Sequence, residues 1–239
     1  MSNSGLAWRW KYSWLICGGY ALLLVFYWWA YARFPLFHAA YLRGEDKAVE
    51  WLTFIGFIMA SFILFRSLRF RKSMSKWAVC YVLGLGLFFG VCAGEEISWG
   101  QRIIGFKTPE TIVGANEQHE FNLHNMSFKH IHPAAMVSLF MKIFGIALPV
   151  ACFKWTRQSD SRLSLYILPV QIAPLFVFGE VLSTVQRQIK PWLVSVYGED
   201  VSLVVRLDTA EFKEMYWGLS VLAASYALYL AWRRSVETV

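Results

Sequence analysis

Runs of about twenty apolar residues constrain this 239-residue chain more than any other feature. A helix of about twenty residues crosses a hydrocarbon layer ~30 Å thick. Lipid offers backbone N–H and C=O groups no partner, so such runs must be helices that satisfy their own hydrogen bonds. Six runs are present, at residues 14–32, 49–68, 77–99, 133–155, 163–185 and 211–232.

The sequence therefore predicts an all-α integral membrane protein, one transmembrane domain over residues 1–239 with a bundle of about six helices. Composition agrees, because only 16% of the residues are charged, whereas soluble domains carry about 25%. The first run resembles a signal peptide, since cations precede it. Tyr27, Trp28 and Trp29 stand just before the small residues that imitate a cleavage site, so we expect an uncleaved helix.

The net charge is +7, which in a soluble protein could indicate nucleic-acid binding. Here the cations lie at the ends of the apolar runs, which indicates an orientation in the membrane instead. Cations are concentrated in the links after the second and fourth runs and after the last run. They are Arg66, Arg69, Arg71, Lys72, Lys76, Lys154, Arg157, Arg162, Arg233 and Arg234. The positive-inside rule then predicts a multi-pass membrane protein with both termini in the cytoplasm, and the expected membrane is the bacterial inner membrane. The loops at residues 33–48, 100–132 and 186–210 are expected on the periplasmic side.

Four of the runs carry a glutamate at a similar predicted depth. Counting helical rise from the cytoplasmic cations places each one ~27 to 29 Å from the inner boundary. A single acid at a helix end is commonly just solvated, but acids within a membrane are costly and often functional. The coincidence predicts an outer-leaflet site. Its expected members are Glu50 for substrate binding and Glu95, Glu96, Glu180 and Glu214 for catalysis.

The third run ends in Gly94-Glu-Glu-Ile-Ser-Trp-Gly-Gln-Arg102. Its polar side chains are expected to bind substrate beside the acids, together with Asn116. They are Ser98, Trp99, Gln101 and Arg102. Arg102 is also a candidate to neutralise Glu95 or Glu96. The sequence leaves open which of these two glutamates faces the bundle, because adjacent helical residues diverge by about 100°.

The loop at residues 100–132 is expected to contain short extra helices, since Thr108-Pro109-Glu110 is typical of a helix start with proline at its first position. The loop also contains Asn116-Glu-Gln-His-Glu-Phe-Asn-Leu-His-Asn125. On a helix, Glu117, Glu120 and His124 share one face. Mixed oxygen and nitrogen ligands suit a divalent metal, whose identity the sequence leaves open. The alternative is a polar loop whose acids and histidines are simply solvated.

Three segments resemble the motifs of a family of bacterial polytopic membrane proteins. They are Glu45-Asp-Lys-Ala-Val-Glu50-Trp51 and the two motifs just quoted, and they cover residues 45–125. The resemblance implies a polytopic membrane fold and carries no established activity. A looser architectural analogy is to the superfamily of alkaline ceramidases and progestin and adipoQ receptors. That pattern has seven helices and a late HxxxH motif, and this chain has neither.

Three functions are compatible with these features. The first is a divalent-metal-dependent membrane enzyme, a hydrolase or transferase acting on a lipid or lipid-linked substrate at the outer face. The second is a proton- or cation-coupled transporter or channel component that uses the same carboxylates. The third is a structural subunit of an envelope complex. Membrane lipid is the expected partner, no nucleic-acid partner is expected, and the oligomeric state is left open.

Overall fold

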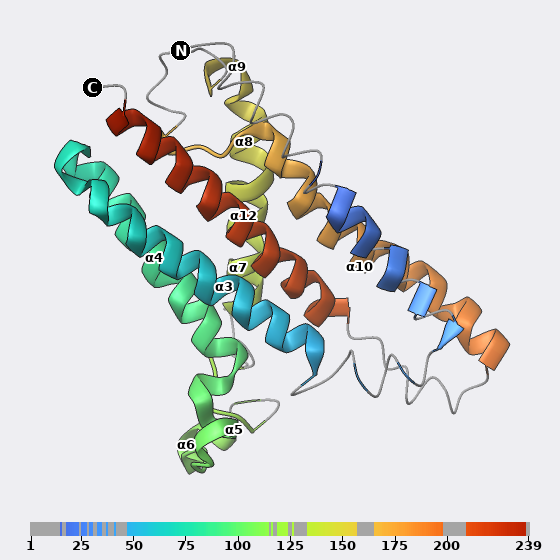
Figure 1. The fold of residues 1–239 in the computed structure, drawn as a ribbon. Helices are drawn as coiled ribbons and strands as arrows, with labels where there is room; N and C mark the ends of the chain where they lie inside the picture. The colour runs from blue at the N-terminus through green and yellow to red at the C-terminus, as the bar shows by residue number, and fades with distance from the viewer. Residues whose placement is uncertain are drawn as a thin grey trace.

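The computed structural model describes residues 47–114, 133–156, 165–197 and 209–237, with individual residues between 15 and 41 and between 116 and 126. These described residues are mostly helical and contain no strand. An isolated antiparallel bridge joins Asn116 to Met126. The all-helical prediction is confirmed for the described part of the chain, whose helices form the elongated bundle in Figure 1.

Three helices of the described residues are long and apolar enough to cross a membrane. The first is α3 (Ala48–Ser67), which continues into the 3-10 helix η2 (Leu68–Ser73). The second is α4 (Lys76–Glu96). The third consists of α7 (Pro133–Lys142), the π-helical turn η4 (Ile143–Ala147) and α8 (Leu148–Ala151). The short α9 (Phe153–Thr156) follows this third helix.

Helices also occupy the remaining apolar runs. Each residue that the structure describes between positions 15 and 33 is helical. The 3-10 helix η6 (Val170–Ile172) leads into α10 (Ala173–Tyr197), and α12 (Thr209–Glu237) completes the chain. Helix α10 begins and ends later than the predicted run 163–185. Pro169 is extended and precedes the helix, whereas Pro174 falls in its first turn, where proline is tolerated.

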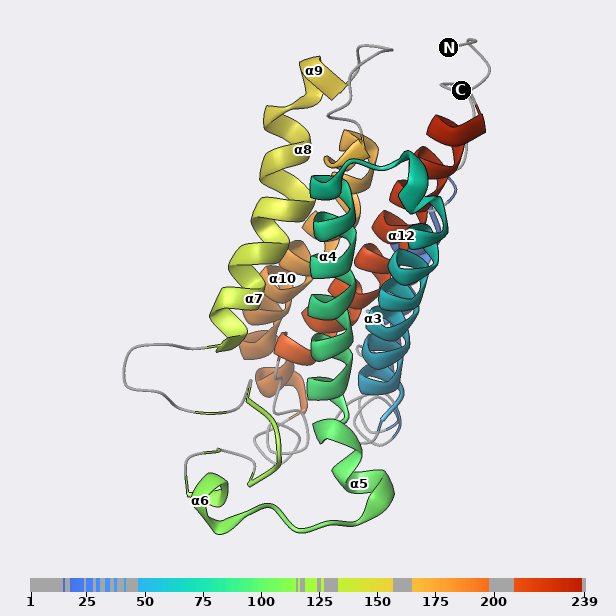
Figure 2. The same cartoon turned by 90° about the vertical axis from the view of Figure 1, so that its left-hand side faces the viewer.

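The helices place different segments at the two ends of the bundle. One end, the loop end, holds the start of α3, the end of α4, and the short helices α5 (Gln101–Ile104) and α6 (Glu110–Val113). The opposite end, the link end, holds η2, α9 and the end of α12 (Figure 2). The cation-rich link Leu68–Ser73 and the cations at the end of α12 therefore lie at the same end.

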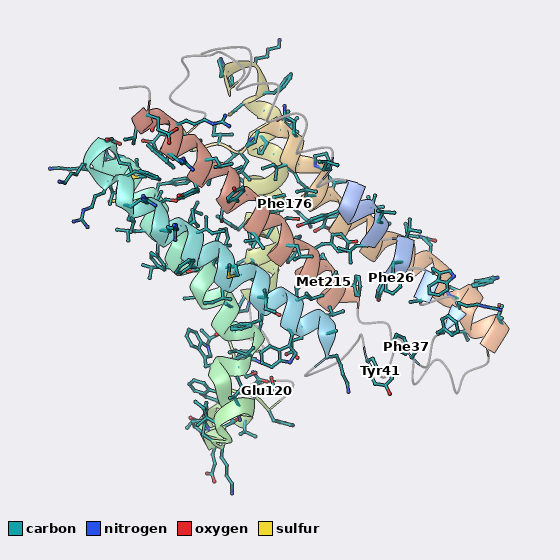
Figure 3. The ribbon with its side chains drawn as sticks, in the orientation of Figure 1. Phe26, Phe37, Tyr41, Glu120, Phe176 and Met215 are labelled. Carbon is teal, nitrogen blue, oxygen red and sulfur yellow. The ribbon has the colours of Figure 1, made fainter. Side chains whose placement is uncertain are left out.

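Buried phenylalanines fill the middle of the bundle. Phe57 of α3 and Phe144 of η4 both contact Phe89 of α4, with ring centroids 6.2 Å apart in each case. Phe144 also contacts Phe176 of α10, at 6.4 Å, and Figure 3 shows Phe176 inside the bundle. We call Phe57, Phe89, Phe144 and Phe176 the aromatic layer. Ring pairs at these separations add to the burial of apolar area.

Helices α3 and α12 cross in backbone contact. A Cβ atom on Gly56 would lie 2.4 Å from the carbonyl carbon of Gly218, and one on Gly218 would lie 2.8 Å from the carbonyl oxygen of Thr53. Between α3 and α4, the Ser61 hydroxyl donates to the Gly86 carbonyl at 2.7 Å. Small residues and interhelical hydrogen bonds of this kind hold helices together in lipid.

Candidate functional site

A left-handed turn follows the end of α4. Ser98, Trp99 and Gly100 have φ angles of 45°, 55° and 79°. Only glycine adopts this region at no cost, so the two other residues are strained by ~1 to 2 kcal/mol each. The turn folds the Trp99 ring back onto α4, where a Cβ atom on Gly94 would lie 2.9 Å from that ring. Gly94 therefore makes room for the indole.

Glu95 connects this turn to the loop that follows it. Its Oε1 accepts a hydrogen bond from Trp99 Nε1 at 2.6 Å, and its Oε2 accepts one from the Leu123 backbone N–H at 2.5 Å. The residue is only 8% exposed. A buried carboxylate is costly unless it is hydrogen-bonded, so these two donors explain how Glu95 is tolerated at the end of an apolar helix.

Ser98 and Glu120 form the centre of a second set of hydrogen bonds. The Ser98 hydroxyl donates to Glu120 Oε2 at 2.5 Å and accepts from Asn122 Nδ2 at 3.1 Å. Asn122 Nδ2 also donates to Glu120 Oε2, at 3.0 Å. Asn116 Nδ2 donates to the backbone and side-chain oxygens of Asn122, both at 2.8 Å, while Asn116 Oδ1 accepts from the Glu120 N–H at 3.2 Å. We call Glu95, Ser98, Asn116, Glu120 and Asn122 the polar clasp.

Gln101 extends the clasp along the loop. Its side-chain oxygen accepts from the Phe121 N–H at 2.7 Å, and its amide donates to the Thr108 hydroxyl at 2.7 Å. The Thr108 hydroxyl in turn donates to the His119 carbonyl at 2.8 Å. Gln101 is therefore a positioning residue that fixes two separate stretches of the loop. Figure 3 shows Glu120 at the loop end, beyond the last turn of α4.

The structure thus brings together six residues that the sequence singled out: Glu95, Ser98, Trp99, Gln101, Asn116 and Glu120. Their side chains hydrogen-bond to one another, to Asn122 and Thr108, and to the loop backbone. Asn122 was missed, although it lies in the same motif as Asn116 and Glu120. The Trp99 ring is 44% exposed. The Arg102 side chain, Glu117 and His124 lie outside the described residues.

Carboxylates from two helices converge on Cys92, one turn above the end of α4. Glu95, Glu96 and Glu214 all interact electrostatically with the Cys92 thiol, so the acids of α4 and α12 occupy one neighbourhood. Glu50 lies in the first turn of α3. It shares a helix face with Thr53, whose backbone borders Gly218 of α12. Three helices therefore direct acids to this part of the loop end.

The four predicted glutamates are all displaced from the aromatic layer toward the loop end, as the helix directions in Figure 2 show. Helical rise gives displacements of ~6 to 10 Å along each helix. They are ~10 Å for Glu50 from Phe57, ~9 Å for Glu95 from Phe89, and ~6 Å for Glu180 from Phe176. Glu214 lies ~6 Å along α12 from Gly218, which contacts Gly56 beside the layer. Glu180 and Glu214 therefore lie ~3 to 4 Å nearer the middle than the other two.

Glu180 has a charged partner that the sequence reasoning missed. Its Oε2 lies 3.6 Å from Lys142 Nζ of α7. Lys142 lies inside the predicted run 133–155, on a different helix from Glu180. A lone lysine within an apolar run was the available signal, because such a cation usually needs a partner from another helix.

The described residues do not form a metal site. No group of three described His, Cys, Asp or Glu side chains is arranged to hold a metal ion. Of the three predicted ligands, Glu120 alone is described, and its Oε2 accepts from Ser98 and Asn122. His119 Nδ1 lies 2.9 Å from the Val113 carbonyl. The metal prediction therefore depends on Glu117 and His124, which lie outside the described residues.

The fold and the site define a class: a helical protein with three membrane-length helices and a polar clasp at one end. Comparison of the chain with protein-family models, with curated proteins and with solved structures finds no match in any of the three.

Proposed function

We propose that the protein is an enzyme of the bacterial inner membrane that acts on the headgroup of a lipid or lipid-linked substrate at the outer face. In this proposal the chain spans the membrane six times, with both termini in the cytoplasm. The observation that supports it is the common displacement of Glu50, Glu95, Glu180 and Glu214 toward the loop end. Glu50 and Glu95 lie near the ends of two membrane-length helices, which is close to the level of lipid headgroups when such helices cross a bilayer.

The aromatic layer favours an enzyme over a transporter. Phe57, Phe89 and Phe176 are at most 1% exposed, and they fill the bundle between the acids and the link end. Transported substrates commonly bind near the bilayer midplane, at broken helices that line a polar path. A packed layer of phenyl rings offers a charged species no such path through this part of the bundle.

In this proposal Glu95 has a structural role that differs from the roles of the other acids. Both carboxylate oxygens of Glu95 accept protein donors, which makes Glu95 a positioning residue for the loop. Glu96 and Glu214 are the candidates for a general base that takes a proton from water or from a substrate hydroxyl. Glu50 and the half-exposed ring of Trp99 are the candidates for contact with the substrate.

A lipid-conversion assay tests this proposal. Protein in nanodiscs is incubated with a total lipid extract of a bacterial inner membrane, and mass spectrometry follows the appearance of products. We expect Glu96→Gln and Glu214→Gln to reduce product formation ~100-fold or more, the usual contribution of a general base. Glu110→Gln, which alters an exposed acid of α6, is the matched control and should keep full activity. Absence of any product, or full activity in both variants, contradicts the proposal.

Metal content is measured separately. Elemental analysis of protein purified without chelator compares the wild type with Glu120→Ala and His124→Ala. Near-stoichiometric metal that is lost in both variants supports a divalent ion held by Glu117, Glu120 and His124. If the wild type contains no metal, lipid conversion should continue in the presence of EDTA. If the purified wild type contains no metal but EDTA still stops lipid conversion, the reaction requires an ion that is not held by Glu117, Glu120 and His124.

Proton or cation transport is the second candidate, and the Lys142–Glu180 pair favours it. Ionisable groups inside membrane helices commonly belong to ion or proton pathways. Proteoliposomes that contain a pH-sensitive dye test this function. A flux that Glu180→Gln abolishes, together with no lipid conversion, would replace the enzyme proposal.

A further inference from the structure

The Lys142–Glu180 ion pair lies at the edge of the bundle, where Lys142 is exposed and Glu180 is partly buried. Lys142 belongs to a helix long and apolar enough to cross a membrane. The side chains are 48% and 28% exposed, and Nζ lies 3.6 Å from Oε2. Lys142 is ~14 Å along the helix from its first residue, Pro133, which is too deep for the headgroup layer to solvate it easily. Charges at this depth usually face protein or water rather than hydrocarbon.

The surroundings of the pair form an apolar face. Met136, Leu139 and Ile143 are 62%, 59% and 45% exposed, and they share one side of the continuous α7–η4 helix because they recur every three or four residues. Lys142 follows Leu139 by three residues and borders this side. On α10, Val177 and Val181 beside Glu180 are 36% and 45% exposed. The helix Pro133–Ala151 is also the least buried of the three membrane-length helices. The exposed face thus combines an apolar surface with one cation and one anion.

We propose that this α7–α10 face is the interface with a second copy of the chain, related by a two-fold axis. In a two-fold interface the same patch meets itself, so that residue i of one copy meets residue j of the other and the reverse. A patch with one lysine and one glutamate is complementary to itself under that operation. Lys142 of each copy then faces Glu180 of the other, and the four charges alternate in sign. The inference does not depend on the proposed function.

Reciprocal charge reversal tests the interface. A chain with Lys142→Glu carries two acids at this face, and a chain with Glu180→Lys carries two cations. Each variant alone should repel its own copy, and we expect its dimer fraction in nanodiscs to fall at least ten-fold. When the two variants carry different affinity tags and are co-expressed, both intermolecular pairs have opposite charges. The mixed dimer should then be recovered to within two-fold of the wild-type level.

Lys154→Glu is the matched control, because it makes the same charge change on an exposed residue of α9. It should leave the dimer fraction, measured by native mass spectrometry, unchanged. Circular dichroism reports whether each reversal variant folds. Where one fails to fold alone, recovery of folded mixed dimer supports the interface, and failure to recover it opposes the interface.

Three results overturn the proposal. They are a monomeric wild type in nanodiscs, reversal variants that dimerise as well as the wild type, and a mixed sample that gives no heterodimer. A different transmembrane protein, or a tightly held lipid, that copurifies with a monomer and is released by Lys142→Glu would assign the face to that partner instead.

Discussion

The loop end and the middle of the bundle are held together by different interactions. At the loop end, two carboxylates are joined by directed hydrogen bonds to Ser98, Asn122 and backbone N–H groups. In the middle, phenyl rings interlock, and α3 and α12 touch through Gly56 and Gly218. Hydrogen bonds depend on chemical identity, whereas close packing depends on volume. A substitution in the middle should therefore affect the whole fold, and one at the loop end should affect mainly the loop.

Gly56→Ala should have the largest effect. The new Cβ atom would lie 2.4 Å from backbone atoms of Gly218, which cannot rotate away as a side chain can. Helices α3 and α12 must then separate, at a cost of ~3 kcal/mol. Unfolding in mixed detergent micelles, followed by circular dichroism, should show this loss in the free energy of unfolding.

Gly84→Ala provides the control for this substitution. No atom lies within 4 Å of a Cβ atom built on Gly84, so the change should stabilise α4 by up to ~1 kcal/mol through helix propensity. If the two alanine variants proved equally stable, the contact between α3 and α12 would not be the close backbone approach described above.

Glu95→Gln should have the next largest effect and should act on the loop. The amide NH₂ group that replaces one oxygen would face a donor, either Trp99 Nε1 or the Leu123 N–H. Loss of a hydrogen bond to a charged group costs ~2 kcal/mol. Hydrogen exchange should therefore show faster exchange of the Leu123 amide. Glu96→Gln, one residue away, should leave that amide protected. Equal protection in both variants would contradict the assignment of Glu95 to the clasp.

Helix positions were predictable because an apolar run long enough to cross a bilayer must satisfy its backbone hydrogen bonds internally, as a helix does. Helices α3, α4 and α12 begin within two residues of the runs expected at 49, 77 and 211. The bounds of α10 differ from the fifth apolar run because hydropathy does not show that Pro169 is extended, nor that polar residues after Val185 continue α10.

The members of the site were easier to predict than their contacts. Adjacent acids at the end of α4 and an Asn- and Glu-rich loop predicted a cluster of polar side chains at this end of the bundle. The sequence could not show that Ser98 adopts a left-handed conformation, which decides where its hydroxyl points. The Lys142–Glu180 pair joins helices that are distant along the chain, so periodicity within either helix carries no information about it.

The smallest expected effect separates strain from hydrogen bonding at Ser98. Ser98→Ala and Ser98→Gly both remove the buried hydroxyl that serves Glu120 and Asn122, and both should weaken the clasp by ~1 to 3 kcal/mol. Glycine also relieves the left-handed backbone at φ 45°. The free energy of opening the clasp should therefore be ~1 kcal/mol higher in the glycine variant than in the alanine variant. Hydrogen exchange of the Leu123 amide measures both, and equal opening free energies would show that the turn at Ser98 carries no strain.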